Sequence, residues 1–259
     1  MKMMLQHELT LSLYIIAFAM LISAVYRFWW QEKPVTIRRL PYLDQIETAV
    51  NSSAERGKPI INLPCGWMSA IVPALGRGFY DVYKHVSTMA GELNVRMYGA
   101  TADAAFHTVY ENYCRQGFIA SGHPERYREE DQLTIIGGSY AWSTGAIGLV
   151  QRTQPGVALF LGMWGWNAQV NVLKACQLLP EKCVMVGAGT YPDNVTYLVA
   201  MCDYTMLSDE CLAVASVLKK ESYFDAKLVG LDLMKLLMVG LLVGSFILAA
   251  LGIDIVQYL

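Results

Sequence analysis

The sequence predicts an α/β domain with a mostly parallel sheet of five or six strands flanked by helices, and one transmembrane helix at each terminus. Short apolar segments without alternation, separated by helical segments, are typical of strands buried on both faces of a sheet. Two uncharged runs of 18 residues lie near the ends of the 259-residue chain. Only 16% of the residues are charged. A soluble domain carries about 25%, so the composition favours a membrane protein.

The two uncharged runs, residues 9–26 and 236–253, are each long enough to cross most of a bilayer core of about 30 Å. Lysine and arginine are enriched on the side of each run that faces the middle of the chain, and positive charge marks the cytoplasmic side. We therefore expect a two-pass protein of the inner cell membrane with both termini outside. A cleaved signal peptide is the alternative for the first run, but the basic residues follow that run instead of preceding it.

These spans divide the chain into an N-terminal anchor (1–30), a connector (31–42), a cytoplasmic α/β domain (43–228) and a C-terminal transmembrane helix (229–259). Gly240 and Gly244 form a GxxxG pattern in the second run, a spacing that lets two helices pack closely. Neither run contains an ionisable residue, which argues against a transport pathway formed by this chain alone.

Apolar spacing, together with glycine, proline and capping residues, predicts the order of elements within the α/β domain. The expected strands are 59–63, 95–98, 133–136, 157–161, 183–186 and, as a sixth candidate, 201–206. The expected helices are 43–56, 68–90, one opened by Asp103 and ended before Gly117, 142–150, 167–179, a short one from Pro192, and 209–218. The charged segment 122–131 is expected to be an exposed loop.

Right-handed crossovers place the carboxyl ends of parallel strands on one edge, so the expected sheet is Rossmann-like, with glycine-rich turns gathered where ligands bind. The candidate ligand-binding residues there are Gly137, Gly138, Ser139, Gly187, Gly189, Thr190 and Asp103, with Asp193 and Asp203 as further acidic candidates. Backbone N–H groups of the glycine turns would cradle a phosphate or another anion. The alternative is that these glycines serve packing and turns, since neither GxGxxG nor GxxxxGK[ST] is present.

Large aromatic residues fall in turns at the same expected edge: Tyr140, Trp142, Trp164, Trp166 and Tyr191. They indicate either a surface for protein–protein contact or burial against neighbouring helices. Histidines and cysteines show no metal-ligand spacing, and no catalytic arrangement is recognisable, so we predict no catalytic residue, metal or cofactor. The six cysteines include no C-x-x-C, and Cys114, Cys176 and Cys211 are expected as small apolar residues of the core.

Several stretches occur in a characteristic order: AERGKPIINLPCG, GGSYAWSTGAIGLVQR, LFLGMWG, VGAGT and CDYTMLSDECLAVASVL. With an anchor at each end, the chain resembles an uncharacterised prokaryotic family of membrane-anchored α/β domains over most of residues 44–252. The resemblance implies Glu210 as a site residue, because Ser208-Asp209-Glu210 stands where the family has Gly-Glu-Glu. The family's acidic residue after LFLGMWG is replaced here by Trp166-Asn167-Ala168.

Two functions are consistent with these patterns. The first is a non-catalytic scaffold or accessory subunit, held in the lipid bilayer, that forms a homo-oligomer or joins other membrane-complex subunits. The second is a membrane-tethered enzyme or sensor that binds a nucleotide or small anionic ligand at the glycine-rich edge. The first is preferred, because a site must be argued from its own residues and not from the fold. A net charge of −2 offers no field for nucleic acid.

Overall fold

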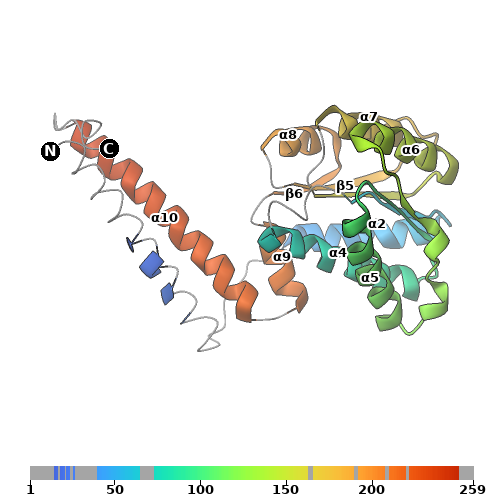
Figure 1. The fold of residues 1–259 in the computed structure, drawn as a ribbon, viewed down its shortest axis with the longest axis horizontal. Helices are drawn as coiled ribbons and strands as arrows, with labels where there is room; N and C mark the ends of the chain where they lie inside the picture. The colour runs from blue at the N-terminus through green and yellow to red at the C-terminus, as the bar shows by residue number, and fades with distance from the viewer. Residues whose placement is uncertain are drawn as a thin grey trace. The chain divides into compact units, whose positions relative to one another are not determined.

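A computed structural model of the chain describes residues 15–16, 18–20, 22–23, 26, 40–64, 73–162, 166–189, 192–207, 210–219 and 222–250. The packing divides the chain into two compact units. One consists of Arg38–Lys219, and the other combines Met1–Ile37 with Lys220–Leu259. The first unit contains the described strands and is an α/β unit (Figure 1).

Six strands form one parallel sheet in the order β3-β2-β1-β4-β5-β6. They are β1 (Ile60–Asn62), β2 (Met97–Thr101), β3 (Gln132–Thr134), β4 (Val157–Leu161), β5 (Val184–Gly189) and β6 (Tyr204–Leu207). The central strand β1 pairs with β2 on one side and with β4 on the other, in the registers Ile60↔Met97 and Ile60↔Val157. This order is that of dinucleotide-binding sheets, with the switch point between β1 and β4. The expectation of a parallel α/β sheet is confirmed.

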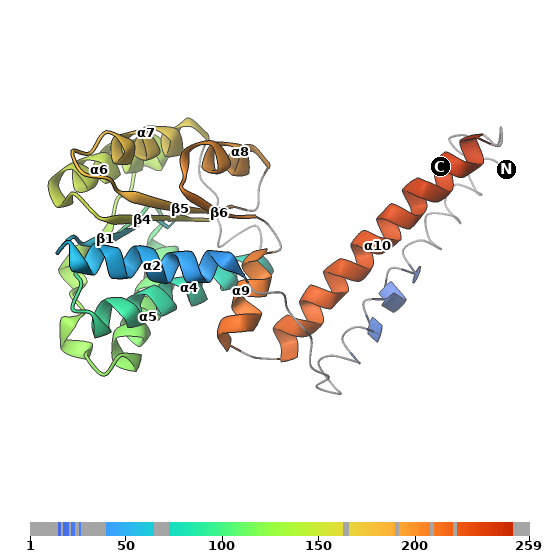
Figure 2. The same ribbon diagram turned by 180° about the vertical axis from the view of Figure 1, so that it is seen from behind.

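Helices cover both faces of the sheet (Figure 2). One face carries α2 (Pro41–Glu55), α4 (Pro73–Glu92), α5 (Ala104–Ala120) and α9 (Glu210–Lys219). The other carries α6 (Gly138–Thr153), α7 (Trp166–Gln177) and α8 (Pro192–Met201). Because both faces are covered, every residue of β1 and β4 is buried. That double burial is the reason why the strands show no polar–apolar alternation in the sequence.

Strand β4 has the bounds that the sequence predicts, whereas β5 extends three residues further because it includes Gly187-Ala188-Gly189. A Cβ atom at Gly187 would lie 2.8 Å from Leu198 Cδ2 and 2.9 Å from Cys202 Sγ. The glycine therefore allows α8 to pack directly on the strand. The turn expected at 187–189 is part of the sheet instead.

The charged segment 122–131 is mostly exposed as expected, and it contains two short 3-10 turns, η2 (Pro124–Arg126) and η3 (Glu129–Asp131). Asp131 is the exception, because its side chain is only 5% exposed. Both of its carboxylate oxygens accept hydrogen bonds at 2.7 Å from Arg96, through Nε and Nη2. This bidentate pair holds the start of the edge strand β3 against the chain that leads into β2.

A buried ion pair connects α9 to α4. Lys219 Nζ lies 3.1 Å from Asp81 Oδ1, and the Asp81 side chain is only 2% exposed. The same ammonium group lies 5.8 Å from the centre of the Tyr113 ring on α5, within the range of a cation–π interaction. The last residue of the α/β unit is thereby held by α4 and α5.

Helix α10 (Ser222–Ala250) contains the segment Phe224–Ile247. This segment has 24 residues and a mean hydropathy of 1.9, so it is long enough and apolar enough to cross a membrane. Only 6% of the residues in its most apolar window are buried. Among the described residues this is the one candidate span, so the expectation of one such helix at each terminus is met only at the C-terminal end. The first predicted run, 9–26, falls largely outside the described residues, although residues 15–16, 18–20 and 22–23 are helical.

Helix α5 approaches α4 so closely at Gly117 that a Cβ atom there would lie 2.5 Å from the Lys84 carbonyl oxygen. We expect Gly117→Ala to lower the free energy of unfolding by about 1–3 kcal/mol, since the backbone of α4 would have to move. Gly148→Ala is the matched control inside α6, because a Cβ atom at that glycine has open space. It should stabilise the protein by about 0.5–1 kcal/mol. Denaturant unfolding of the detergent-solubilised chain measures both, and equal effects would contradict the close approach.

Candidate functional site

The carboxyl edge of the sheet, where ligands bind in this architecture, contains the ends of all six strands. At the switch point β1 ends at Asn62 and β4 ends at Leu161. The connections that follow these two strands, residues 65–72 and 163–165, lie outside the described residues. The part of the edge that the structure describes in full follows β2 and β3, and there the predicted residues can be placed.

The start of α6 has the geometry of an uncapped helix N-terminus. Gly137 is the N-cap residue with φ 132°, and Gly138 is the first helical residue with φ 85°. No side chain caps this end, and a Cβ atom at Gly138 would meet no atom within 4 Å. The first N–H groups, including that of the half-buried Ser139, have no partner within the helix and carry the positive end of its dipole. Gly137, Gly138 and Ser139 therefore form the expected strand-to-helix turn.

The described glycines of the second predicted cradle lie in a strand and not in a turn. Gly187 and Gly189 are buried in β5, and Thr190 lies outside the described residues. Strands β3 and β5 are four positions apart in the sheet. At about 4.8 Å per strand, the two glycine sets are separated by about 19 Å. One phosphate cannot contact both sets.

The two acidic candidates at the edge are engaged by the backbone. Asp103 caps α5, since its Oδ1 accepts hydrogen bonds from the N–H groups of Ala105 at 2.8 Å and Phe106 at 3.1 Å. Glu210 Oε2 accepts a hydrogen bond from Leu207 N at 3.1 Å and ties the end of β6 to the start of α9. Each carboxylate has a local structural role.

Of the other two acidic candidates, Asp203 lies away from this edge. Asp203 precedes β6 and accepts a hydrogen bond from Met185 N at 2.9 Å, so it belongs to the amino edge and not to the carboxyl edge. The side chain of Asp193, in the first turn of α8, is outside what the structure describes.

A hydroxyl, an imidazole and a carboxylate come together at the end of β2, a combination that the sequence analysis missed. Thr101 Oγ1 lies 3.0 Å from His107 Nδ1, and His107 Nε2 lies 3.8 Å from Glu111. This order resembles a nucleophile with its base and orienting acid. Thr101 is fully buried, however, and its hydroxyl also lies 3.3 Å from the Leu133 carbonyl oxygen, to which it can donate. The arrangement links β2, β3 and α5 and leaves the hydroxyl inaccessible to a substrate.

The predicted aromatic residues separate into different environments. Tyr140 is exposed over 71% of its surface. Trp142 is only 1% exposed, and its Nε1–H donates to the Ala100 carbonyl oxygen at 2.9 Å, so it belongs to the core and not to an interface. Trp166 is the first residue of α7, but its side chain is not described, and Trp164 and Tyr191 lie outside the described residues.

Gln169, which the sequence analysis also missed, is the most unusual polar group near the switch point. It is fully buried in the α7 helix that follows β4, and within the described part of the chain neither its Nε2 nor its Oε1 has a hydrogen-bond partner. An unpaired buried amide costs about 1–3 kcal/mol. The sequence did contain the signal, because Gln169, Val172, Leu173 and Cys176 share the i, i+3, i+4, i+7 spacing of one buried helix face.

The fold and α10 together define a parallel α/β protein with one helix suited to crossing a membrane. Among the described residues, no group of three or more His, Cys, Asp or Glu side chains is arranged to hold a metal ion. The chain belongs to the family described as Domain of unknown function (DUF6754), which covers residues 1–259. Comparisons with curated proteins and with solved structures gave no match.

Proposed function

We propose that this protein is a membrane-anchored scaffold or accessory subunit, non-catalytic, that assembles with itself or with other membrane proteins. The observation that carries the proposal is the surface of α10. Its apolar side chains are exposed around the helix, with Leu236, Leu242 and Phe246 exposed over 65%, 67% and 77% of their surfaces. A helix that is apolar on all sides needs a lipid or protein environment.

Charge placement supports a two-pass topology with the α/β unit in the cytoplasm. Lys219, Lys220, Lys227 and Lys235 precede the apolar part of α10, and no lysine or arginine follows it. In the same way, the run at 9–26 has Arg27, Lys33, Arg38 and Arg39 on its inner side. The positive-inside tendency then places both termini outside. The first run serves in this proposal as a second anchor.

The glycines of α10 support helix-to-helix assembly. Gly240 and Gly244 lie one turn apart, and among the described residues a Cβ atom at either glycine would meet no atom within 4 Å. The small-residue face of the helix is therefore open to close approach by another helix. At the carboxyl edge of the sheet, Asp103 and Glu210 already accept hydrogen bonds from backbone N–H groups, which supports a non-catalytic role.

Charges placed in the middle of α10 should remove the anchor. The double change Val239→Arg and Leu242→Arg adds about 5–7 kcal/mol to the cost of insertion, at about 2.5–3.5 kcal/mol for each arginine. We expect less of the full chain to remain in membranes washed with alkaline carbonate. The matched control is Leu93→Arg with Leu178→Arg, at exposed positions of the α/β unit. Wild-type protein released by carbonate would contradict the anchor.

Orientation is tested separately from anchoring. A reporter that is active only outside the cytoplasm, fused after Leu259, should be active in intact cells. Activity of a reporter that works only in the cytoplasm, fused at the same position, would contradict the proposed topology.

Bulky residues at the glycines should weaken assembly. The full chain extracted in mild detergent is expected to appear in native mass spectrometry as an oligomer or a complex. Gly240→Leu with Gly244→Leu should reduce that association by about tenfold, which corresponds to about 1.4 kcal/mol. Val239→Leu with Val243→Leu is the control on neighbouring positions of the same helix. A monomeric wild-type protein, or equal effects of the two pairs, would reject the scaffold role.

Gln169 favours a second candidate function, in which a nucleotide or small anionic ligand binds at the switch point. A ligand that pairs with the buried amide would recover the free energy that the unpaired group costs in the free protein. The analogy with other sheets of this strand order points to the same place, but only at the level of the fold.

Gln169→Leu should raise the Tm of the ligand-free protein, because it replaces an unpaired amide with an apolar group of similar size. It should also remove the Tm shift caused by nucleotides or inorganic phosphate in the wild-type chain. Gln177→Leu, on the same helix but exposed, is the control. If none of these ligands shifts the wild-type Tm, or if a shift persists in Gln169→Leu, the second function is rejected while the scaffold role is unaffected.

A further inference from the structure

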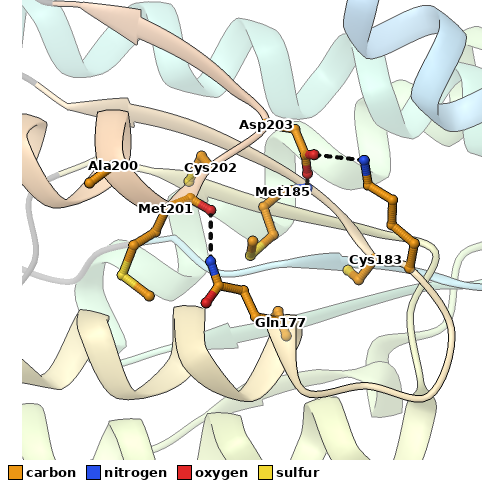
Figure 3. Close-up of a pocket in the computed structure, with 9 residues that line it drawn as sticks. Gln177, Cys183, Met185, Ala200, Met201, Cys202 and Asp203 are labelled. Carbon is orange, nitrogen blue, oxygen red and sulfur yellow. Dashed lines mark hydrogen bonds and ion pairs between the residues drawn. The ribbon is translucent and has the colours of Figure 1, made fainter.

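A pocket of about 280 Å³ lies at the amino edge of the sheet, opposite the edge considered above (Figure 3). It is bounded by the end of α7, the start of β5, the end of α8 and the chain that enters β6. The structure describes the side chains of four cysteines. Three of them line this pocket, namely Cys176, Cys183 and Cys202. None of these three residues takes part in a disulfide. We call this feature the thiol pocket.

The fold brings the three thiols together from different elements. Cys176 is the next-to-last residue of α7, and Cys183 directly precedes β5. Cys202 follows α8, and β6 begins two residues later beside β5. The six residues between Cys176 and Cys183 return the chain from the helix to the edge of the sheet. The pocket therefore depends on two adjacent strands and on the two helices that cover them.

The side chains of Cys176 and Cys183 interact with each other in the thiol pocket. Contact with Cys183, together with burial, raises the pKa of the Cys176 thiol far above its ordinary value, because two neighbouring sulfurs do not readily ionise together. Burial raises the pKa of Cys202 to about 12. Cys176 and Cys202 are therefore protonated at neutral pH and are poor first nucleophiles. Cys183 is the less deeply buried of the contacting pair, at 5% exposed against 1% for Cys176, so we assign it as the first sulfur to react and Cys176 as its neighbour.

The pocket gives a small molecule a route toward the buried thiol of Cys183. The mouth is polar, since Lys182 Nζ lies 2.9 Å from Asp203 Oδ1 and Gln177 Nε2 donates to the Met201 carbonyl oxygen at 3.3 Å (Figure 3). The side chain of Lys182 is 74% exposed, so it can move away from this surface ion pair at little cost. Cys183 therefore lies in the wall of a pocket whose mouth widens when Lys182 moves away.

We propose that Cys176 and Cys183 are a reversible thiol–disulfide site that exchanges with a small-molecule disulfide entering this pocket. Cys183, as a thiolate, attacks one sulfur of the disulfide RS–SR, whose S–S bond breaks. One RS⁻ leaves with the electron pair and takes up the proton that Cys183 lost. Cys176 then loses its proton and attacks the Cys183 sulfur of the mixed disulfide, and the second RS⁻ leaves and takes up that proton. Two protein thiols are oxidised, and one RS–SR is reduced to two RSH.

The test uses the full chain in mild detergent, equilibrated with glutathione disulfide, quenched with acid, alkylated and mapped by mass spectrometry. We expect a peptide in which Cys176 and Cys183 are linked, with the loss of two hydrogens, and its disappearance when excess glutathione is added. Cys114 is the internal control, because it is fully buried with a pKa raised to about 12 and lines no part of the thiol pocket. It should remain a free thiol.

Single variants separate the two roles. Cys176→Ser should trap a mixed disulfide of glutathione on Cys183, because the resolving sulfur is gone. Cys183→Ser should leave Cys176 reduced, and Cys202→Ser should keep the wild-type link. The wild-type measurement needs no variant, so a misfolded variant does not remove the test. The proposal is overturned if the wild-type chain gains no Cys176–Cys183 link, or if the link instead joins Cys202 or a cysteine outside the pocket.

Discussion

The parallel arrangement of the six strands is the constraint on which the rest of the structure depends. Parallel neighbours require crossover connections, and right-handed crossovers make every strand begin at one edge and end at the other. The helix N-terminus at Gly138 and the Asp103 cap therefore lie at the carboxyl edge, whereas Cys183 and Cys202 lie at the amino edge. The six residues of β5 separate the two edges by about 20 Å. The two regions are chemically independent for that reason.

Much of the fold was predictable because the strands are short, apolar and buried on both faces. The bounds of β4 agree with the apolar run at 157–161. Helix α5 begins directly after Asp103, the residue that the sequence indicates as its N-cap. Glycine was less informative, since it has two uses. At Gly137 and Gly138 it supplies positive φ for a turn, whereas at Gly187 it makes room for α8. The second use depends on a helix packed from elsewhere in the fold, which a local pattern does not reveal.

The candidate site was harder to predict than the fold because polar side chains acquire their roles from distant partners. Asp131 belongs to a charged segment that is expected to be exposed. Its side chain is buried instead, because it forms a bidentate pair with Arg96, which precedes β2. The sequence position of Trp142 is consistent with a surface or a buried side chain, and its hydrogen bond to the Ala100 carbonyl oxygen places it in the core. Gln169 shows the opposite outcome, since no described side chain compensates for its burial. Of these three residues only Gln169 has a spacing that predicts burial, and the pairing of the polar atoms depends in every case on partners that are distant in the sequence.

The ion pair between Lys219 and Asp81 has a mechanical consequence. Lys219 is the last residue of the α/β unit, so tension applied to the chain beyond it enters the unit at this point. The Asp81 carboxylate on α4 and the Tyr113 ring on α5 both attract the Lys219 ammonium group, so they oppose its displacement under such tension. The load on the end of α9 is therefore shared with two neighbouring helices.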